Sequence, residues 1–255
     1  RWNGCGSVGR RRAMRHGRQR IAWGGRGSRA LDGAHTRDSW AGAAAGVAVQ
    51  VTERFLLVGL GNPGRDYRQH RHNIGFMLLD RLAEQNGWSF GRVQYQALVC
   101  SGALAGQQVL LAKPQTYMNE SGRSVSQLLR FYKVGLDHLL VACDDLDLPL
   151  GTLRFRASGG SGGQKGVRSI IEQLGSQEFA RLRMGIGRPP GRMDPADYVL
   201  RPFRAEEEPL RDQVLGEAAE ALETFLREGI TLAMSRHNGS VLDEHLGSSE
   251  AAASS

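Results

Sequence analysis

The sequence predicts a single-domain α/β fold, in which a mixed β-sheet is flanked by helices on both faces. Between residues 54 and 229, short apolar runs typical of buried strands alternate with stretches whose apolar residues recur at helical spacing. Two apolar runs within residues 95–114 flank a glycine-containing turn, which indicates a hairpin. Because a hairpin supplies antiparallel pairing, the sheet is expected to be mixed.

The predicted elements follow one another along this part of the chain. Strands are expected at residues 54–60, twice within 95–114, and at 138–143, 151–158 and 181–187, and helices at 74–86, 121–135, 166–175 and 206–229. The last helix carries five apolar residues on one face, so it should pack as a closing helix. These residues are Leu210, Val214, Ala218, Leu222 and Phe225.

The two ends of the chain differ in composition from this region. We expect residues 1–53 to be a disordered basic extension, residues 54–240 to be the α/β domain, and residues 241–255 to be a flexible tail. Residues 1–50 contain ten arginines, two acidic residues and much glycine and alanine without a sustained period, a composition typical of disorder. Since the sequence begins with Arg1 rather than methionine, we expect a fragment, a processed form or a start upstream of the natural one.

The cysteines and the basic extension bear on the location of the protein. Cys5, Cys100 and Cys143 are odd in number and lack C-x-x-C spacing, which suits a reducing compartment and argues against a zinc ribbon. We therefore expect a cytoplasmic protein, or an organellar one if residues 1–50 are an arginine-rich transit peptide. No apolar run approaches the roughly 18 residues of a membrane-spanning helix, so no membrane association is expected.

Charge is distributed unevenly along the chain. The total is +7 at pH 7, but residues 1–50 carry +8 and residues 51–255 carry −1. Within the second part, residues 151–192 hold eight Lys and Arg against two acidic residues, whereas residues 201–255 hold five against eleven. The basic segment is consistent with a phosphate-facing surface or with an ordinary solvated face.

Gly59, Gly61 and Gly64 spell G-x-G-x-x-G directly after the first predicted strand. In a dinucleotide-binding fold, a helix would begin at the third glycine and hold a pyrophosphate. Here Gly64 is followed by a polar stretch, and Asp80, at the distance of the expected acidic residue, falls inside a predicted helix. A tight turn that presents Asn62 explains the glycines better. A nucleotide-dependent enzyme is the alternative.

Four polar loops follow predicted strands, and we expect them to converge on one edge of the sheet. The first holds Asn62, Tyr67 and His72, the second Asn119, the third Asp144, Asp145 and Asp147, and the fourth, "ASGGSGGQKG", Lys165. Taken singly, each loop can be explained by helix caps, turns or a flexible connector. Taken together, the four loops predict a functional site.

These loops carry a resemblance to a known family. The segments "VGLGNPGRDYRQHRHNIGF", "KPQTYMNESG", "DDLDLPLGTLRFRASGGSGGQKGVRSII" and "FARLRMGIGRP" closely resemble bacterial-type peptidyl-tRNA hydrolases in order and spacing. The resemblance covers residues 54–238. It implies a monomeric α/β enzyme without a metal or organic cofactor. The implied reaction is hydrolysis of the ester between a peptide and the 3′ end of tRNA, which recycles tRNA from aborted or stalled translation.

The resemblance also implies roles for single residues. His72 resembles the general base that takes a proton from water, a task suited to a side chain that changes its charge near neutral pH. Asp144 resembles the partner that fixes the imidazole tautomer and steadies the imidazolium. Asn62 and Asn119 resemble the amides that hold the peptide and the water and donate to the developing oxyanion.

Further positions match the family less directly. Tyr67 and Met118 are expected to line the peptide or terminal-adenosine groove, although packing explains Met118 equally well. In well-studied relatives, the fourth loop carries His-Asn where this chain has Gln164 and Lys165, which puts in doubt the substrate contact made by that asparagine. Lys165 can instead meet a phosphate or the ester as a cation. Cys143 stands where a histidine is often found.

Two arginines resemble the clamp that this family places on the 5′ phosphate of tRNA. They are Arg156 and Arg183, with Arg154, Lys165 and Arg168 nearby in sequence. Phosphate contacts position a nucleic acid without reading its sequence. The expected partner is therefore peptidyl-tRNA, bound through its acceptor arm, 5′ phosphate and 3′ end. An RNA-binding protein without hydrolase activity is a second alternative, because some relatives act as splicing partners.

Overall fold

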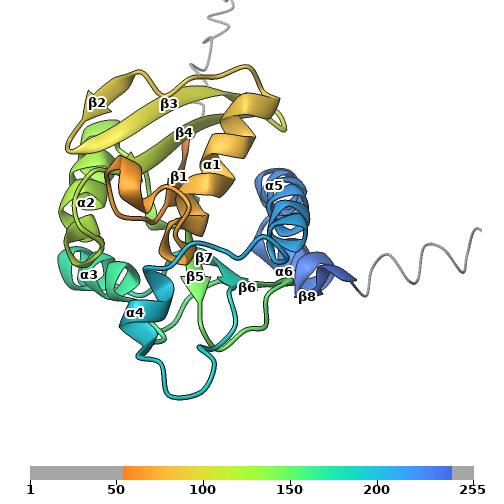
Figure 1. The fold of residues 1–255 in the computed structure, drawn as a ribbon. Helices are drawn as coiled ribbons and strands as arrows, with labels where there is room; N and C mark the ends of the chain where they lie inside the picture. The colour runs from red at the N-terminus through yellow and green to blue at the C-terminus, as the bar shows by residue number, and fades with distance from the viewer. Residues whose placement is uncertain (1–53, 243–255) are drawn as a thin grey trace, which may run out of the picture. The chain divides into compact units, whose positions relative to one another are not determined.

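An eight-stranded sheet forms the centre of the domain (Figure 1). The structure is a computed structural model that describes residues 54–242; the predictions for residues 1–53 and 243–255 lie outside the described residues. The strand order is β2-β3-β4-β1-β5-β7-β6-β8. The strands are β1 (Arg54–Gly59), β2 (Arg92–Gln94), β3 (Ala97–Leu104), β4 (Gln107–Pro114), β5 (Leu139–Asp145), β6 (Thr152–Arg156), β7 (Ala180–Gly185) and β8 (Gly239–Ser240).

The sheet is mixed, as the sequence predicts. The strand β1 lies between β4 and β5 and runs parallel to both, and β5 runs parallel to β7. The strands β3 and β6 each pair antiparallel with both of their neighbours. The carboxyl ends of β1, β4, β5 and β7 therefore lie at one edge of the sheet.

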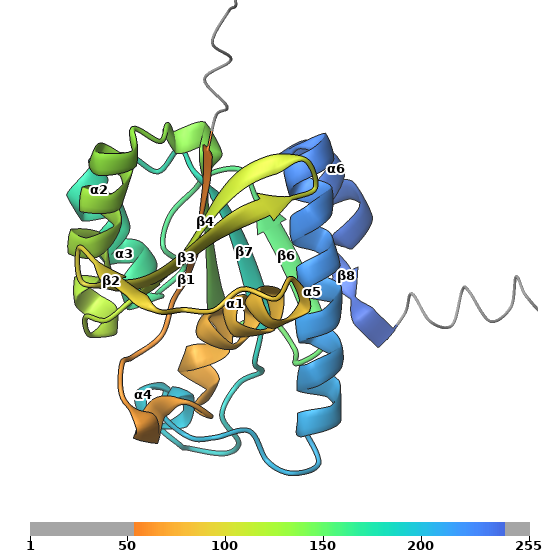
Figure 2. The ribbon, with the colours of Figure 1, turned by 90° about the horizontal axis from the view of Figure 1, so that it is seen from above.

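Helices cover both faces of the sheet (Figure 2). They are α1 (Ile74–Gln85), α2 (Ser121–Tyr132), α3 (Lys165–Leu174), α4 (Pro195–Val199), α5 (Glu208–Glu228) and α6 (Ile230–His237). Side chains alternate along β1, so Leu57 packs in the core with α1 and α5, whereas Leu56 and Val58 pack in the core with α2 and α3. Burial on both faces explains the nearly continuous apolar run of this central strand.

Gly59, the last residue of β1, and Gly61 serve packing. A Cβ at Gly59 would lie 2.2 Å from the carbonyl oxygen of Gly75, and one at Gly61 would lie 2.8 Å from the Phe76 ring. These positions therefore allow β1 and the start of α1 to approach closely. After Gly64 the chain forms a short 3₁₀ turn, Arg65–Tyr67, and no α-helix begins before Ile74. The dinucleotide-binding alternative is wrong, because it requires an α-helix that begins at the third glycine, and α1 begins ten residues later.

Every strand and helix predicted from the sequence is present, with ends within three residues of those expected. The elements that were not predicted are short: β2, β8, α4 and α6. Beyond the expected domain boundary, Val241 is still buried in the core. Within residues 54–242, no helix is both long and apolar enough to cross a membrane.

The prediction that all four polar loops follow strand ends at one edge is wrong for the fourth loop. Because β6 is antiparallel to β7, Arg156 at its carboxyl end pairs with Arg181 at the opposite edge of the sheet. The glycine-rich segment that follows β6 carries the chain back to the edge where β5 and β7 end. It reaches that edge at Gln164, directly before α3.

Candidate active site

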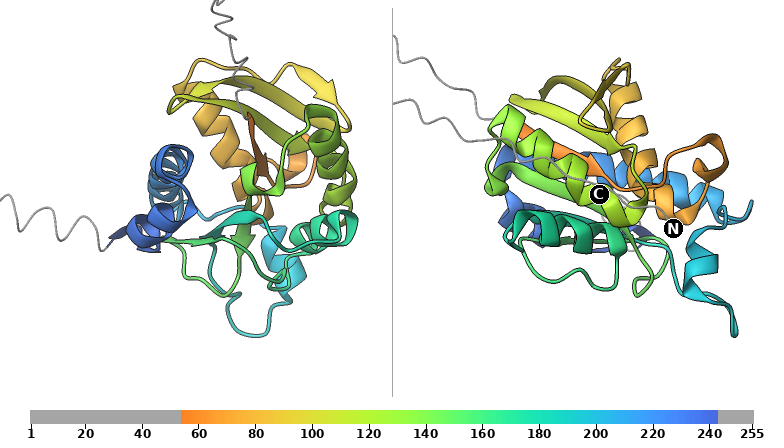
Figure 3. Two further views of the ribbon diagram at one scale, coloured as in Figure 1. Left: turned by 180° about the vertical axis from the view of Figure 1, so that it is seen from behind. Right: turned by 90° about the vertical axis from the view of Figure 1, so that its left-hand side faces the viewer.

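A cavity of about 670 Å³ lies at the carboxyl edge of the sheet, and we call it the His72 cavity. Eight of the nine site residues predicted from the sequence line it; Arg156 does not. The eight are Asn62, Tyr67, His72, Met118, Asn119, Asp144, Lys165 and Arg183. The segment that contains α4 supplies another wall, with Val199 and Leu200. Two views show α4 beside the segment that joins β1 to α1 (Figures 2 and 3).

His72 and Asp144 form a hydrogen-bonded pair in this cavity. His72 lies in a 3₁₀ turn just before α1, and Asp144 is the penultimate residue of β5. His72 Nδ1 lies 2.8 Å from Asp144 Oδ2, and the two side chains are 11% and 4% exposed. A carboxylate at Nδ1 favours the tautomer with the proton on that nitrogen. The lone pair of Nε2 is then available to a water molecule.

Gln164 holds the other oxygen of Asp144, a contact that no pattern in the sequence predicts. Its Nε2 donates to Asp144 Oδ1 over 3.1 Å and lies 3.2 Å from Met118 Sδ. Its Oε1 accepts from the backbone N–H of Val167 over 2.8 Å, so Gln164 also caps α3. Glutamine is not among the preferred helix-capping residues, which is why the sequence carried no signal for this role.

The amide of Asn62 has a fixed orientation. Its Oδ1 accepts from the backbone N–H of Met118 over 2.9 Å, which leaves Nδ2 as the donor. The backbone of Asn62 is held in turn by Asn73, which accepts from its N–H and donates to its carbonyl oxygen, each over 2.9 Å. Asn73 is a second residue that the sequence analysis missed. Asn119, by contrast, is exposed at the rim of the cavity.

Four arginines share one face of the β6–β7 pair. Arg154 is opposite Arg183 and Arg156 is opposite Arg181 in the antiparallel register, so all four side chains project from the same side. Arg156 is exposed. Arg183 lies beside the His72 cavity, where its Nε is 2.6 Å from Oδ2 of the buried Asp145.

Burial shifts the pKa values of Asp145 and Arg181. Burial raises the pKa of Asp145, whereas the backbone N–H of Asp147 and the charge of Arg183 act in the opposite direction. Burial also lowers the pKa of Arg181. The guanidinium of Arg181 donates to the carbonyl oxygens of Gly159, Gly160 and Gln177, so this arginine fastens the glycine-rich segment to the sheet.

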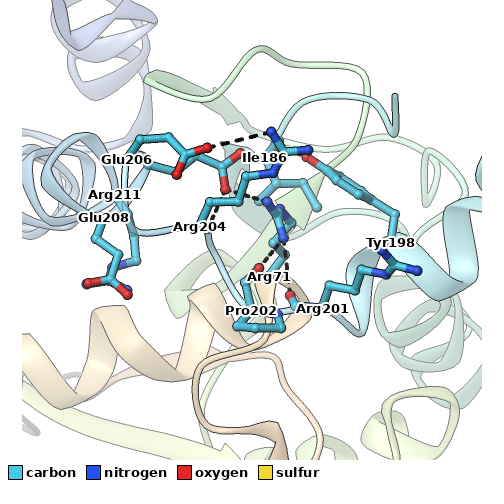
Figure 4. A network of polar contacts seen from close by, with 10 residues as sticks. Arg71, Ile186, Tyr198, Arg201, Pro202, Arg204, Glu206, Glu208 and Arg211 are labelled. Carbon is cyan, nitrogen blue, oxygen red and sulfur yellow. Dashed lines mark hydrogen bonds and ion pairs between the residues drawn. The ribbon is translucent and has the colours of Figure 1, made fainter. Parts of the chain in front are cut away.

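Arg71, next to His72, is buried in a network with the segment after α4 (Figure 4). Its side chain donates to the carbonyl oxygens of Arg201 and Pro202 and forms an ion pair with Glu207. Its guanidinium also lies 4.4 Å from the ring centroid of Tyr198. The network joins the turn that carries His72 to the α4 wall of the cavity.

A second, larger cavity of about 880 Å³ adjoins Asn62, and we call it the Lys113 cavity. Lys113 forms an ion pair there with Asp80, and its Nζ lies 4.0 Å from the centroid of the Phe90 ring. Neither cavity has a metal-ligand cluster: residues 54–242 contain no group of three or more His, Cys, Asp or Glu side chains suited to a metal ion.

Comparisons with known proteins identify the family of this chain. The model of the family described as peptidyl-tRNA hydrolase matches residues 56–245. The chain belongs to the peptidyl-tRNA hydrolase family. A peptidyl-tRNA hydrolase of Chloroflexus aurantiacus is 52% identical over 185 residues, covering 72% of this chain and 98% of the relative. A chloroplastic peptidyl-tRNA hydrolase of Arabidopsis thaliana is 50% identical over 176 residues, which are 69% of this chain and 61% of the relative.

A solved structure supports the same assignment. The crystal structure of peptidyl-tRNA hydrolase from Acinetobacter baumannii matches with a TM-score of 0.69 and 34% identity, covering 74% of this chain and 96% of the other. The family and the α/β fold predicted from the sequence are thereby confirmed.

Proposed function

We propose that this protein hydrolyses the ester bond between peptide and tRNA in peptidyl-tRNA and so recycles tRNA from aborted or stalled translation. The observation that carries the proposal is the 2.8 Å contact between His72 Nδ1 and Asp144 Oδ2 at the wall of a cavity, in a chain of this family. A protein that only binds RNA has no need of a base held by a carboxylate, which weighs against the non-enzymatic alternative.

His72 acts as the general base in this proposal. Its Nε2 takes a proton from a water molecule as the water oxygen attacks the ester carbonyl carbon. Asp144 keeps the imidazole in the required tautomer and stabilises the imidazolium that forms. The imidazolium then gives its proton to the 3′ oxygen of tRNA as the ester bond breaks.

Asn62 and Asn119 stabilise the negative charge that develops on the carbonyl oxygen. Since Asn62 Oδ1 is engaged by the N–H of Met118, its Nδ2 is the atom that donates to the oxyanion. An amide donor suits this position because it adds no charge that would require neutralisation. Asn119, at the rim, holds the peptide and the attacking water.

The remaining predicted residues bind the substrate. Tyr67 and the buried Met118 line the groove for the peptide or the terminal adenosine. Lys165, exposed at the first position of α3, meets a phosphate or the ester region. Arg156 and Arg183 hold the 5′ phosphate of the acceptor arm. Phosphate contacts of this kind position any elongator tRNA without reading its sequence.

The proposal covers the domain as a unit. Residues 54–240 act as a monomer and use no metal or organic cofactor, and residues 1–53 and 241–255 are not needed for chemistry. The protein acts in the cytoplasm, or in an organelle if residues 1–50 are a targeting peptide. Relatives named chloroplastic and mitochondrial exist in plants. A reporter fused to residues 1–50 separates the two locations.

The test is release of peptide from an N-blocked aminoacyl-tRNA by the purified protein, with and without a metal chelator. We expect equal turnover in both conditions and unchanged turnover after deletion of residues 1–50. A folded protein that binds the tRNA but releases no peptide would overturn the proposal in favour of RNA binding alone.

A further inference from the structure

Gln164 contacts Asp144, the side chain that we propose to orient the base. We infer that Gln164 is a positioning residue, whose amide fixes the Asp144 carboxylate in the orientation that His72 requires. The inference rests on the proposed function. It concerns a position at which this chain departs from the His-Asn of well-studied relatives.

Both carboxylate oxygens of Asp144 are engaged by hydrogen bonds. Oδ2 meets His72 Nδ1 at 2.8 Å and Oδ1 meets Gln164 Nε2 at 3.1 Å. Asp144 is only 4% exposed, so a buried oxygen that lost its donor would pay a desolvation penalty. Two fixed contacts on one carboxylate also prevent it from rotating away from the imidazole.

Gln164 cannot exchange the positions of its amide oxygen and nitrogen without losing contacts. Its Oε1 accepts from the N–H of Val167 over 2.8 Å, and this contact directs Nε2 towards Asp144. A flipped amide would set an oxygen against the carboxylate and a nitrogen against an N–H, so both hydrogen bonds would be lost. The rigid first turn of α3 thus sets the direction of the Asp144 carboxylate.

The group that donates to Asp144 Oδ1, the amide of Gln164, is uncharged. A cation at this place would compete with the imidazolium for the carboxylate charge, whereas an amide satisfies Oδ1 and leaves that charge in place. Lys165, the neighbouring residue, lines the cavity but has no hydrogen bond or ion pair with Asp144 among those of residues 54–242. The arrangement therefore separates orientation by Gln164 from substrate binding by Lys165.

The test uses three substitutions that distinguish the hydrogen bond of Gln164 to Asp144 from its hydrogen bond to Val167. Gln164→Glu keeps an oxygen for the N–H of Val167 but replaces the donor to Asp144 with a second negative charge. Gln164→Met removes both contacts at similar volume. Gln164→His keeps one donor and one acceptor on a single side chain. Steady-state kinetics on N-blocked aminoacyl-tRNA, tRNA affinity and thermal unfolding are measured for each.

We expect kcat to fall by roughly tenfold to a hundredfold in Gln164→Glu and Gln164→Met, the usual scale for residues that orient a functional side chain. KM and tRNA affinity should stay within about twofold, and Gln164→His should retain most of kcat. A residue that only caps α3 would give a different pattern, because Gln164→Glu preserves the cap. A kcat for a folded Gln164→Glu variant within about twofold of the parent value would overturn the inference.

A second readout does not depend on turnover. The Nδ1 proton of His72 should give a downfield NMR resonance that His72→Ala removes. We expect this resonance to be lost or shifted in Gln164→Glu and kept in Gln164→His. An inactive parent protein would refute the proposed function alone; an unchanged resonance in Gln164→Glu would refute the positioning role whether or not the parent is active.

Discussion

The two cavities that adjoin Asn62 differ in how their polar groups are used. In the larger Lys113 cavity, the Lys113 ammonium is paired with Asp80 and lies over the Phe90 ring. In the smaller His72 cavity, the protein contacts engage one side of each key group: Nδ1 of His72 and Oδ1 of Asn62. Within residues 54–242, no hydrogen bond engages the opposite atoms, His72 Nε2 and Asn62 Nδ2.

Size alone does not identify the candidate active site. The Lys113 cavity is the larger, about 880 Å³ against about 670 Å³, and has several charged residues, but its Lys113 ammonium is already engaged by Asp80 and the Phe90 ring. The His72 cavity has an imidazole hydrogen-bonded to a carboxylate and one amide donor of fixed direction, Nδ2 of Asn62, a combination that suits the ester hydrolysis we propose.

The largest effect should come from removing the base. His72→Ala is expected to lower kcat by a factor on the order of 10²–10⁴, the usual contribution of a positioned general base. The tRNA affinity should be unchanged, because His72 is not among the residues that we propose to bind phosphate. Single-turnover kinetics and a filter-binding titration measure the two quantities. A His72→Ala variant with kcat near that of the parent would rule out the assignment of the base.

A somewhat smaller loss is expected at Asn62. Asn62→Asp retains the oxygen that accepts from Met118 N–H but replaces the Nδ2 donor with an anion facing the developing charge. We expect kcat to fall by about 10²–10³, as for the loss of one oxyanion donor. Thermal unfolding is the control for damage to the loop. The melting temperature should be unchanged, because the contacts of Asn73 with the backbone of residue 62 are retained. Full activity in Asn62→Asp would show that Nδ2 does not meet the oxyanion.

Replacing either arginine that we propose to hold the 5′ phosphate should weaken substrate binding more than turnover. The two replacements should differ in their effect on stability. Arg156→Ala and Arg183→Ala are each expected to raise KM and to lower the slope of log affinity against log salt by about one per phosphate contact. Only Arg183→Ala should also destabilise the fold, because it leaves the buried Asp145 without its cation. Salt titrations and melting curves test both points. An unchanged salt slope in the double variant would contradict the clamp.

The smallest effect on catalysis is expected in the Lys113 cavity. Lys113→Met should leave kcat and KM within about twofold of the parent, while the loss of the ion pair and the ring contact costs about 1 kcal/mol of the free energy of unfolding. Denaturant unfolding and the peptide-release assay are the measurements. A loss of kcat comparable to that of Asn62→Asp would show that the larger cavity takes part in the reaction.

Much of the fold could be predicted from the sequence because its elements are long and strongly patterned. The apolar run at β1 predicts a strand, and the apolar face of α5 predicts a helix. The short elements α4 and β8 carry too few residues for a period to be seen. The direction of β6 could not be predicted either, since an apolar run does not specify its pairing.

The sequence predicts the residues of the candidate site whose side-chain type itself suggests chemistry. It does not predict the residues whose role depends on a tertiary contact. His72, Asp144 and Asn62 belong to polar loops that follow strands ending at one edge. The contacts of Gln164 with Asp144 and of Arg71 with Pro202 join residues 20 or more positions apart in sequence, so no local pattern indicates them. The burial of Arg71 in particular is the reverse of what its residue type suggests.

The most direct test of the central claim is a double-mutant cycle on His72 and Asp144. Asp144→Asn, His72→Ala and the double variant are compared with the parent by single-turnover release of peptide from N-blocked aminoacyl-tRNA. If Asp144 acts through His72, Asp144→Asn should lower the rate by on the order of 10² or more in the parent and by less than about threefold in the His72→Ala background. An equal loss in both backgrounds would contradict the account, because the two residues would then act independently.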